Sequence, residues 1–190
     1  NESEANFAVV YDPANTPPVR RAADKPVCMN GKVRDAMGPK IRFGLAGLRG
    51  AGEGAIETVF EARRDEDGKA LPPFLDLFDF TSRVDLRRVN KGVVEALVQS
   101  GAFDSVHQKI DVTRGQAFAA IETATERGKK IAADRNSGQT SLFGLLEDND
   151  ATKALSRPVS EFPKVEPWDT RELLAREKQT LGFYVSGHPL

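Results

Sequence analysis

The sequence predicts a mainly α-helical fold with a small β element. Apolar residues recur at helical spacing in several stretches, which is the pattern of helices that bury one face. Only two short stretches near the N-terminus show the β-branched enrichment or the alternation typical of strands. Segments rich in glycine, proline and charge separate these elements and are typical of loops.

Composition bounds the kind of protein. The 190 residues suffice for one domain or two small ones, and the net charge of −1 means that nucleic acid must be met by a local patch or by backbone amides. With Cys28 as the one cysteine and only His107 and His188 as histidines, an internal disulfide is impossible and a Cys/His zinc site is nearly excluded. No apolar run is long enough to span a membrane, so we expect a cytoplasmic protein without membrane contact.

The two strands are expected near the N-terminus. "NFAVVY", residues 6–11, is β-branched and aromatic, and "IRFGL", residues 41–45, alternates, as a partner strand or the lead-in to a helix does. Residues 12–40 between them are rich in proline, alanine and charge, which predicts a long, poorly ordered excursion.

Helical spacing begins after the second strand. Ile56, Val59 and Phe60 predict a helix over Glu53–Arg64, and "FLDLFDF" places its apolar residues on one helical face, namely Phe74, Leu77 and Phe78. A clear helix follows from Asn90, a suitable N-cap, to Gly101, and its apolar stripe consists of Val93, Val94, Leu97 and Val98.

Two more helices are predicted in the second half. One runs from about Arg114 to Ala133 with small residues on one face, namely Ala117, Ala124 and Gly128. A loop by composition follows, and the last helix begins at a capping-box-like pair, Asp169 and Glu172. We expect the chain to be a segment of a larger protein, because it begins without methionine and ends on an apolar, Gly-Pro-containing stretch.

The glycine-rich stretch "LAGLRGAGEGAI" is the main candidate site. A Walker A loop is rejected because no Gly-Lys-Ser/Thr follows the glycines, and a Rossmann turn is disfavoured because no second parallel strand follows. Leu45 and Leu48 followed by the glycines fit a helix-hairpin-helix, in which free amides at a helix N-terminus bind a DNA phosphate. The alternative is a plain glycine turn. The candidate DNA-binding residues here are Arg49, Gly50, Ala51, Gly52, Glu53 and Gly54.

A second, degenerate hairpin is predicted in "LVQSGAFDSV". Gly101 matches the first glycine, but Phe103 replaces the second, so a helix C-cap followed by a core phenylalanine is an equal alternative. Just upstream, three basic residues near the helix start either neutralise phosphates or form a solvated surface, namely Arg87, Arg88 and Lys91.

The loop after the long helix contains the apolar peptide "QTSLF". Its side chains either dock into a partner's apolar pocket or fold back onto the core of this chain. The candidate docking residues are Gln139, Ser141, Leu142 and Phe143.

In combination, these features resemble one family, the bacterial replicative DNA polymerase III alpha subunit. The matching stretches are "IRFGLAGLRGAGEGAIETV", "LFDFTSRVDLRRVNKGVVEALVQSGAFDS", "GQTSLFG" and "EKQTLGFYVSGHPL". The resemblance implies the end of the fingers region and an insertion over 1–40, a tandem helix-hairpin-helix domain over 41–134, a loop over 135–168 and a helix leading towards an OB domain over 169–190.

The resemblance also implies partners. These are double-stranded DNA, the sliding clamp (beta subunit), which would bind the "QTSLF" peptide, and other holoenzyme subunits at the nucleoid. The Mg²⁺-dependent nucleotidyltransferase centre would lie in the palm, so this segment would lack cofactors and catalytic residues. Consistent with this, no Asp-x-Asp pair of the matching kind occurs in a strand context. The insertion over 12–40 and Thr140 depart from the family pattern. A stand-alone repair-type helix-hairpin-helix module and a structural spacer are the alternative functions.

Overall fold

The computed structural model describes residues 5–10, 27–29, 32–34, 40–65, 67–136 and 161–188. By its contacts the chain divides into two units, residues 2–45 and, together with Asn1, residues 46–190. All described strands lie in the first unit and all described α-helices in the second. The predicted mainly α-helical fold with a small β element is therefore confirmed.

The first unit contains two small antiparallel sheets. In one, Val9 lies opposite Ile41, as predicted for a partner strand, and in the other Cys28 lies opposite Val33. The second sheet was not predicted, because strands of three residues are too short for a period to be recognised. The strands are β1 (Ala8–Val10), β2 (Val27–Met29), β3 (Lys32–Arg34) and β4 (Lys40–Arg42).

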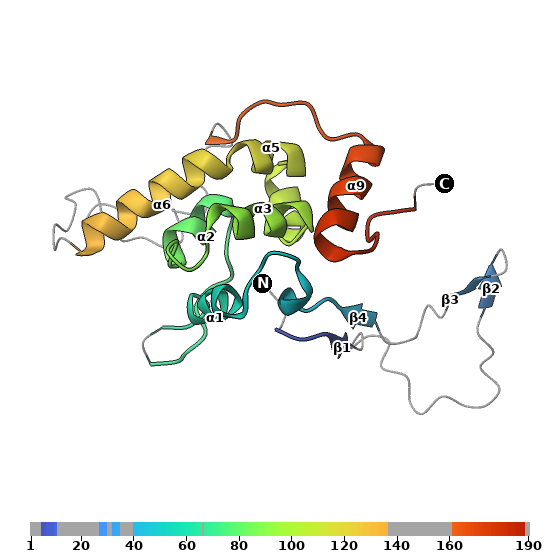
Figure 1. Cartoon of the computed structure of the whole chain (residues 1–190), viewed down its shortest axis with the longest axis horizontal. Helices are drawn as coiled ribbons and strands as arrows, with labels where there is room; N and C mark the ends of the chain where they lie inside the picture. The colour runs from blue at the N-terminus through green and yellow to red at the C-terminus, as the bar shows by residue number, and fades with distance from the viewer. Residues whose placement is uncertain are drawn as a thin grey trace. The chain divides into compact units, whose positions relative to one another are not determined.

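The second unit is built from helices (Figure 1). The short 3₁₀ turn η2 (Leu45–Gly47) precedes it and η3 (Gln108–Ile110) lies within it. The α-helices are α1 (Glu53–Glu61), α2 (Leu77–Arg83), α3 (Lys91–Gln99), α4 (Asp104–His107), α5 (Arg114–Ala119), α6 (Ile121–Asn136) and α9 (Thr170–Leu181).

Side-chain caps fix where several helices begin. The Asn90 side chain accepts from the Val93 amide at the start of α3, and the Asp169 side chain accepts from the Glu172 amide at the start of α9. Both predicted N-caps are thus confirmed. Gly101 ends α3 with a φ of 80°, as the sequence predicted.

Three predicted helix boundaries were wrong. The helix predicted to reach Arg64 ends at Glu61. Phe74 lies before α2, because the Asp76 side chain accepts from the Asp79 amide and starts the helix at Leu77. Phe74 is nevertheless buried. The single helix predicted from Arg114 is two, α5 and α6, interrupted at Ala120.

A chain of touching aromatic rings runs through the core of the second unit. Successive ring centroids are 5.1–5.4 Å apart. The rings, in spatial order, are Phe74, Phe80, Phe103, His107, Phe162 and Phe78. Aromatic rings offset or edge-on to one another add to the stabilisation from burial alone. The chain therefore links α2, the segment around α4 and the stretch that precedes α9.

The closest helix packing occurs between α2 and α6, which lie side by side in Figure 1. The Thr81 hydroxyl donates to the carbonyl of Ala124 at 2.9 Å. A Cβ atom at Gly128 would lie 2.3 Å from the Thr81 carbonyl oxygen, so only glycine allows this approach. Two residues of the predicted small-residue face, Ala124 and Gly128, thus meet α2, whereas Ala117 lies in α5.

His107 makes the stability of the fold depend on pH. Its Nε2 accepts from the Leu77 amide at 3.3 Å, which requires the neutral ring, and burial lowers its pKa from 6.5 to about 4. Below pH 6.5 His107 becomes protonated in the unfolded chain, whereas in the folded chain it stays neutral down to about pH 4. Stability from this residue is therefore complete above pH 6.5 and falls by about 3 kcal/mol between pH 6.5 and 4.

Urea unfolding at several pH values measures this effect. In His107→Gln the amide oxygen can still accept from Leu77 but does not titrate, so the fall between pH 6.5 and 4 should become smaller. An unchanged pH profile in this variant would assign the acid sensitivity to other groups.

Candidate nucleic-acid interface

The loop between η2 and α1, residues 48–52, forms an open turn. Gly50 has a φ of 84°, which favours glycine, and the amide of Ala51 donates to the carbonyl of Leu48 at 3.2 Å. Gly52 is extended and acts as the N-cap of α1 without any side-chain cap. A Cβ atom at Gly50 or Gly52 would meet no atom within 4 Å, so the turn has open space in front of it.

Several amides of this turn are free to bind a ligand. The Arg49 amide donates to the carbonyl of Thr180 at 2.9 Å, and the Ala55 amide donates to that of Gly52. Among the described residues, the structure provides no acceptor for the amides of Gly50, Gly52, Glu53 and Gly54. Unsatisfied amides at a helix N-terminus carry partial positive charge and suit an anion such as phosphate.

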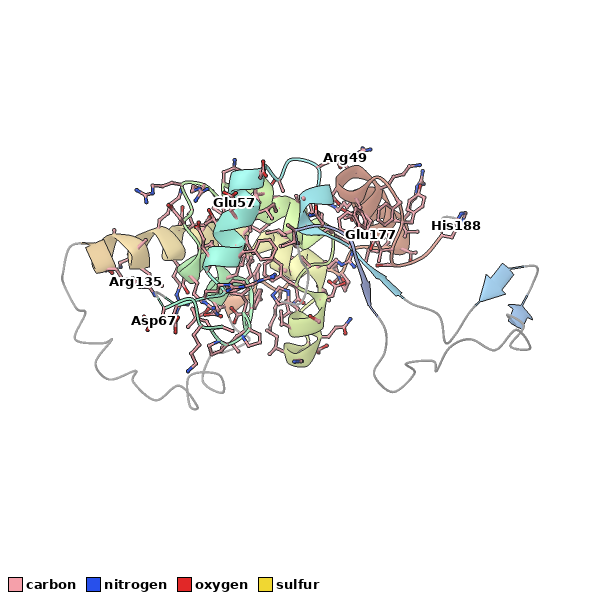
Figure 2. The ribbon with its side chains drawn as sticks, turned by 90° about the horizontal axis from the view of Figure 1, so that it is seen from below. Arg49, Glu57, Asp67, Arg135, Glu177 and His188 are labelled. Atoms are coloured by element: carbon pink, nitrogen blue, oxygen red, sulfur yellow. The ribbon has the colours of Figure 1, made fainter. Side chains whose placement is uncertain are left out.

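Of the predicted basic residues, Arg49 stands apart. Its side chain is exposed, points outward at the upper edge of Figure 2, and has no carboxylate partner within the described part of the chain. It lies beside Gly182, where a Cβ atom would be 3.2 Å from Arg49 Nη2. Among the predicted cations, Arg49 is therefore the one that the described carboxylates leave unpaired, and it directly precedes Gly50 in the chain.

The other three predicted cations each pair with carboxylates. Arg88 lies beside Gly54 but contacts Glu57 at 3.2 Å and Glu61 at 3.5 Å, both on α1. Lys91 lies 4.0 Å from Glu122. These carboxylates offset much of the positive charge that was expected to face phosphates.

Arg87 pairs locally with Asp85. The two side chains make two hydrogen bonds, at 2.9 and 3.0 Å. The bond from Arg87 lowers the pKa of Asp85, and the carboxylate raises the pKa of Arg87. Arg87 is 89% exposed, so a phosphate can still replace Asp85 as its partner.

The second hairpin, between α3 and α4, is closed. The amide of Gly101 donates to Val98 and that of Ala102 to Leu97, and Phe103 is buried in the core. A Cβ atom at Gly101 would lie 2.3 Å from Arg114 Nη2. Gly101 therefore ends α3 just after its C-cap, against the Arg114 guanidinium, and Phe103 is a core residue. This is the alternative that the sequence analysis gave for the second hairpin.

Arg114 belongs to a buried ion-pair network that the sequence analysis missed. It donates to both carboxylate oxygens of Asp104 and, through Nη1, to Glu177 at 2.8 Å. Glu177 also accepts from the amides of Val185 and Ser186 at 2.8 and 2.9 Å and from the Ser186 hydroxyl. Burial alone would raise the pKa of Glu177, but these hydrogen bonds outweigh it and lower the pKa.

A sequence signal for this network exists. Glu177 lies three residues after Leu174 and four before Leu181, so it occupies the apolar face of α9. A carboxylate in such a position needs a buried partner. The partner itself is distant in sequence and is not marked by any pattern.

The predicted docking peptide, with its residues Gln139, Ser141, Leu142 and Phe143, lies outside the described residues. Its two flanks are described. α6 precedes it, and after it Glu161 pairs with Arg127 at 2.5 Å while Phe162 is buried between Phe78 and His107. The segment thus leaves and re-enters the same helical unit.

A family profile described as "Helix-hairpin-helix motif" matches residues 1–117. The chain belongs to this helix-hairpin-helix family. The matched residues include η2, the open hairpin and α1, and also α2, α3 and α4 with the closed hairpin.

The chain is also similar to DNA polymerase III subunit alpha from several bacteria, which confirms the resemblance seen in the sequence. It is 37% identical over 164 residues to the Pseudomonas fluorescens protein, 34% over 150 residues to that of Vibrio cholerae and 36% over 151 residues to that of Caulobacter vibrioides. These matches cover 79–80% of this chain but only 12–13% of each relative. Within the described residues, none of the helices is both long and apolar enough to cross a bilayer.

Proposed function

We propose that this chain is a DNA-binding segment of a replicative polymerase alpha subunit and that the open hairpin, residues 48–52, contacts the backbone of duplex DNA. The observation that carries this proposal is that the amides of Gly50, Gly52, Glu53 and Gly54 have no acceptor among the described residues, with open space at the Cβ positions of Gly50 and Gly52. Arg49 adds a cation beside them. Contacts of this kind recognise phosphate and are indifferent to base sequence.

The charge distribution bears on the strength of binding. The net charge is −1, and Arg88 and Lys91 already lie close to carboxylates. Few counterions are therefore released when this segment binds, and each phosphate contact contributes about 0.9 to the slope of log K against log salt. We expect weak duplex binding with a slope of roughly 1–3.

Gly52→Val tests the hairpin directly. Gly52 has a φ of −69°, which valine adopts, and open space surrounds its Cβ position, so the fold should be retained. The valine side chain would occupy the space in front of the free amides. We expect duplex affinity to fall about tenfold, while the salt slope stays nearly unchanged, because the blocked amides carry no net charge and the cations that neutralise phosphates remain. Fluorescence anisotropy with a labelled duplex at several salt concentrations measures both.

Ala102→Val is the matched control at the second hairpin. Ala102 is exposed, but its amide and that of Gly101 already donate to main-chain carbonyls. Its duplex affinity should equal that of the unchanged chain. If Gly52→Val binds as the unchanged chain does, while circular dichroism shows an intact fold, the open hairpin is not the DNA contact.

We further propose that Gln139–Phe143 docks to the sliding clamp. The support is the sequence of the peptide together with the similarity to polymerase alpha subunits. Leu142 and Phe143 would supply the apolar anchors, which dominate the affinity of a short docking peptide. The chain spans about an eighth of the length of its relatives. For the longer protein we therefore propose polymerase activity with the Mg²⁺ that it needs, binding to other holoenzyme subunits, and a place at the bacterial replisome.

Capture by immobilised sliding clamp tests the docking proposal. Phe143→Ala should reduce capture at least tenfold without changing duplex binding. Leu145→Ala, an apolar change two residues beyond the peptide, is the control and should leave capture unchanged. Equal capture of both variants would exclude this peptide as the docking site, and the DNA proposal would stand independently.

A further inference from the structure

The C-terminal end of α9 holds the open hairpin in place. The last carbonyls of a helix have no partner within the helix, and that of Thr180 accepts from the Arg49 amide at 2.9 Å. The Arg49 side chain also lies against Gly182, which ends α9 with a φ of 86°. Both the backbone and the side chain of Arg49 therefore contact this helix end.

Three residues before Thr180, Glu177 anchors α9 to neighbouring parts of the helical unit. Its side chain is 0% exposed and accepts from Arg114 and from the chain after the helix, at Val185 and Ser186. Arg114 in turn holds Asp104 at the start of α4 and covers Gly101 of the closed hairpin. Glu177 thereby joins α9 to the closed hairpin, while Thr180 joins the same helix to the open one.

We infer that Glu177 is a positioning residue for the open hairpin, acting through the Thr180 carbonyl on Arg49. This inference rests on the proposed DNA contact of that hairpin. Glu177 and Thr180 are separated by less than one helical turn, so a shift of one moves the other. With the Arg49 amide held by α9, the turn keeps the conformation in which the amides of Gly50 and Gly52 have no acceptor among the described residues. Releasing Arg49 would let the loop sample other conformations, and ligand binding would have to order it again.

The test is Glu177→Gln in the full chain. The amide keeps the shape of the side chain and can accept from Val185 or Ser186, but it loses the charge that binds Arg114. We expect duplex affinity to fall about tenfold with an unchanged salt slope, because no phosphate contact is removed. In the protein without DNA, hydrogen exchange at the Arg49 amide should accelerate about tenfold relative to that of Val94, a fully buried residue of α3.

Glu172→Gln is the matched control. Glu172 lies on the same helix but forms an exposed pair with Arg176, so neither affinity nor Arg49 exchange should change. If Glu177→Gln proves too unstable, Ser186→Ala is the second variant. It removes the hydroxyl that donates to Glu177 and accepts from Arg114, leaves both charges in place, and should show the same changes in smaller measure.

The outcomes separate this inference from the proposed function. Faster exchange at both Arg49 and Val94 by the same factor would show general destabilisation and overturn the inference, as would unchanged Arg49 exchange. If the unchanged chain binds no duplex, the proposed function fails, yet selective acceleration at Arg49 still supports the positioning role of Glu177.

Discussion

Replacing Arg114 with alanine is expected to lower the free energy of unfolding by about 3–5 kcal/mol. The substitution leaves the Glu177 carboxylate, which is fully buried, without its cation, and also removes the three hydrogen bonds to Asp104. An uncompensated charge in the interior costs far more than the loss of an exposed ion pair, because water cannot replace the missing partner. Urea denaturation followed by circular dichroism measures the change.

Arg87→Ala is the control for this prediction. Arg87 also pairs with a carboxylate, that of Asp85, but its side chain is 89% exposed, so its removal should not measurably change stability. A double-mutant cycle of Arg114→Ala and Glu177→Ala should give a combined loss smaller than the sum of the two single losses. Additive losses, or equal stability of Arg114→Ala and Arg87→Ala, would contradict the description of this network as a coupled buried unit.

Gly128→Ala is expected to destabilise the protein by about 3 kcal/mol, although alanine is the better helix former. The added methyl group would lie 2.3 Å from the Thr81 carbonyl oxygen and 2.9 Å from Leu86 Cδ1. The nearest atom belongs to the backbone of α2, so no side-chain rotation relieves the clash. The two helices must separate, which also strains the bond from the Thr81 hydroxyl to Ala124.

Thermal unfolding of Gly54→Ala provides the comparison. Gly54 also lies within a helix, but the nearest atoms to its Cβ position belong to the end of the Arg88 side chain, at 3.3 Å. This side chain can move, so the variant should be as stable as the unchanged chain or slightly more so. A melting temperature of Gly128→Ala that is not lowered, relative to Gly54→Ala, would show that α2 and α6 can separate at little cost.

Local patterns were enough to predict most of the helices. Asn90 and Gly101 bound α3 as the sequence indicated, because a side-chain cap and a positive φ are encoded by the residue at that position. Asp169 likewise starts α9. The break between α5 and α6 at Ala120 was missed, since alanine is a good helix former and gives no local signal of an end.

The candidate site was predictable only in part. The open hairpin was recognised from its glycines, of which Gly50 takes the positive φ that few other residues allow. The carboxylate partners of Arg88 and Lys91 were not, because Glu57 and Glu122 are 31 residues away from them in sequence. Ion pairs between distant residues depend on the tertiary fold, and a list of basic residues therefore overestimates the positive charge available to DNA.

The burial of Phe162 bears on how a bound clamp would be held. Its ring lies between Phe78 and His107, immediately after residues 137–160, and α6 fixes the chain immediately before them. A clamp docked on Gln139–Phe143 would thus be bound to a segment whose two ends are both fixed to the helical unit, which allows less motion than a tail fixed at one end. The length of this connection would set the effective concentration of the clamp near the hairpin that we propose as the DNA contact, so weak docking at this peptide would still prolong residence on DNA.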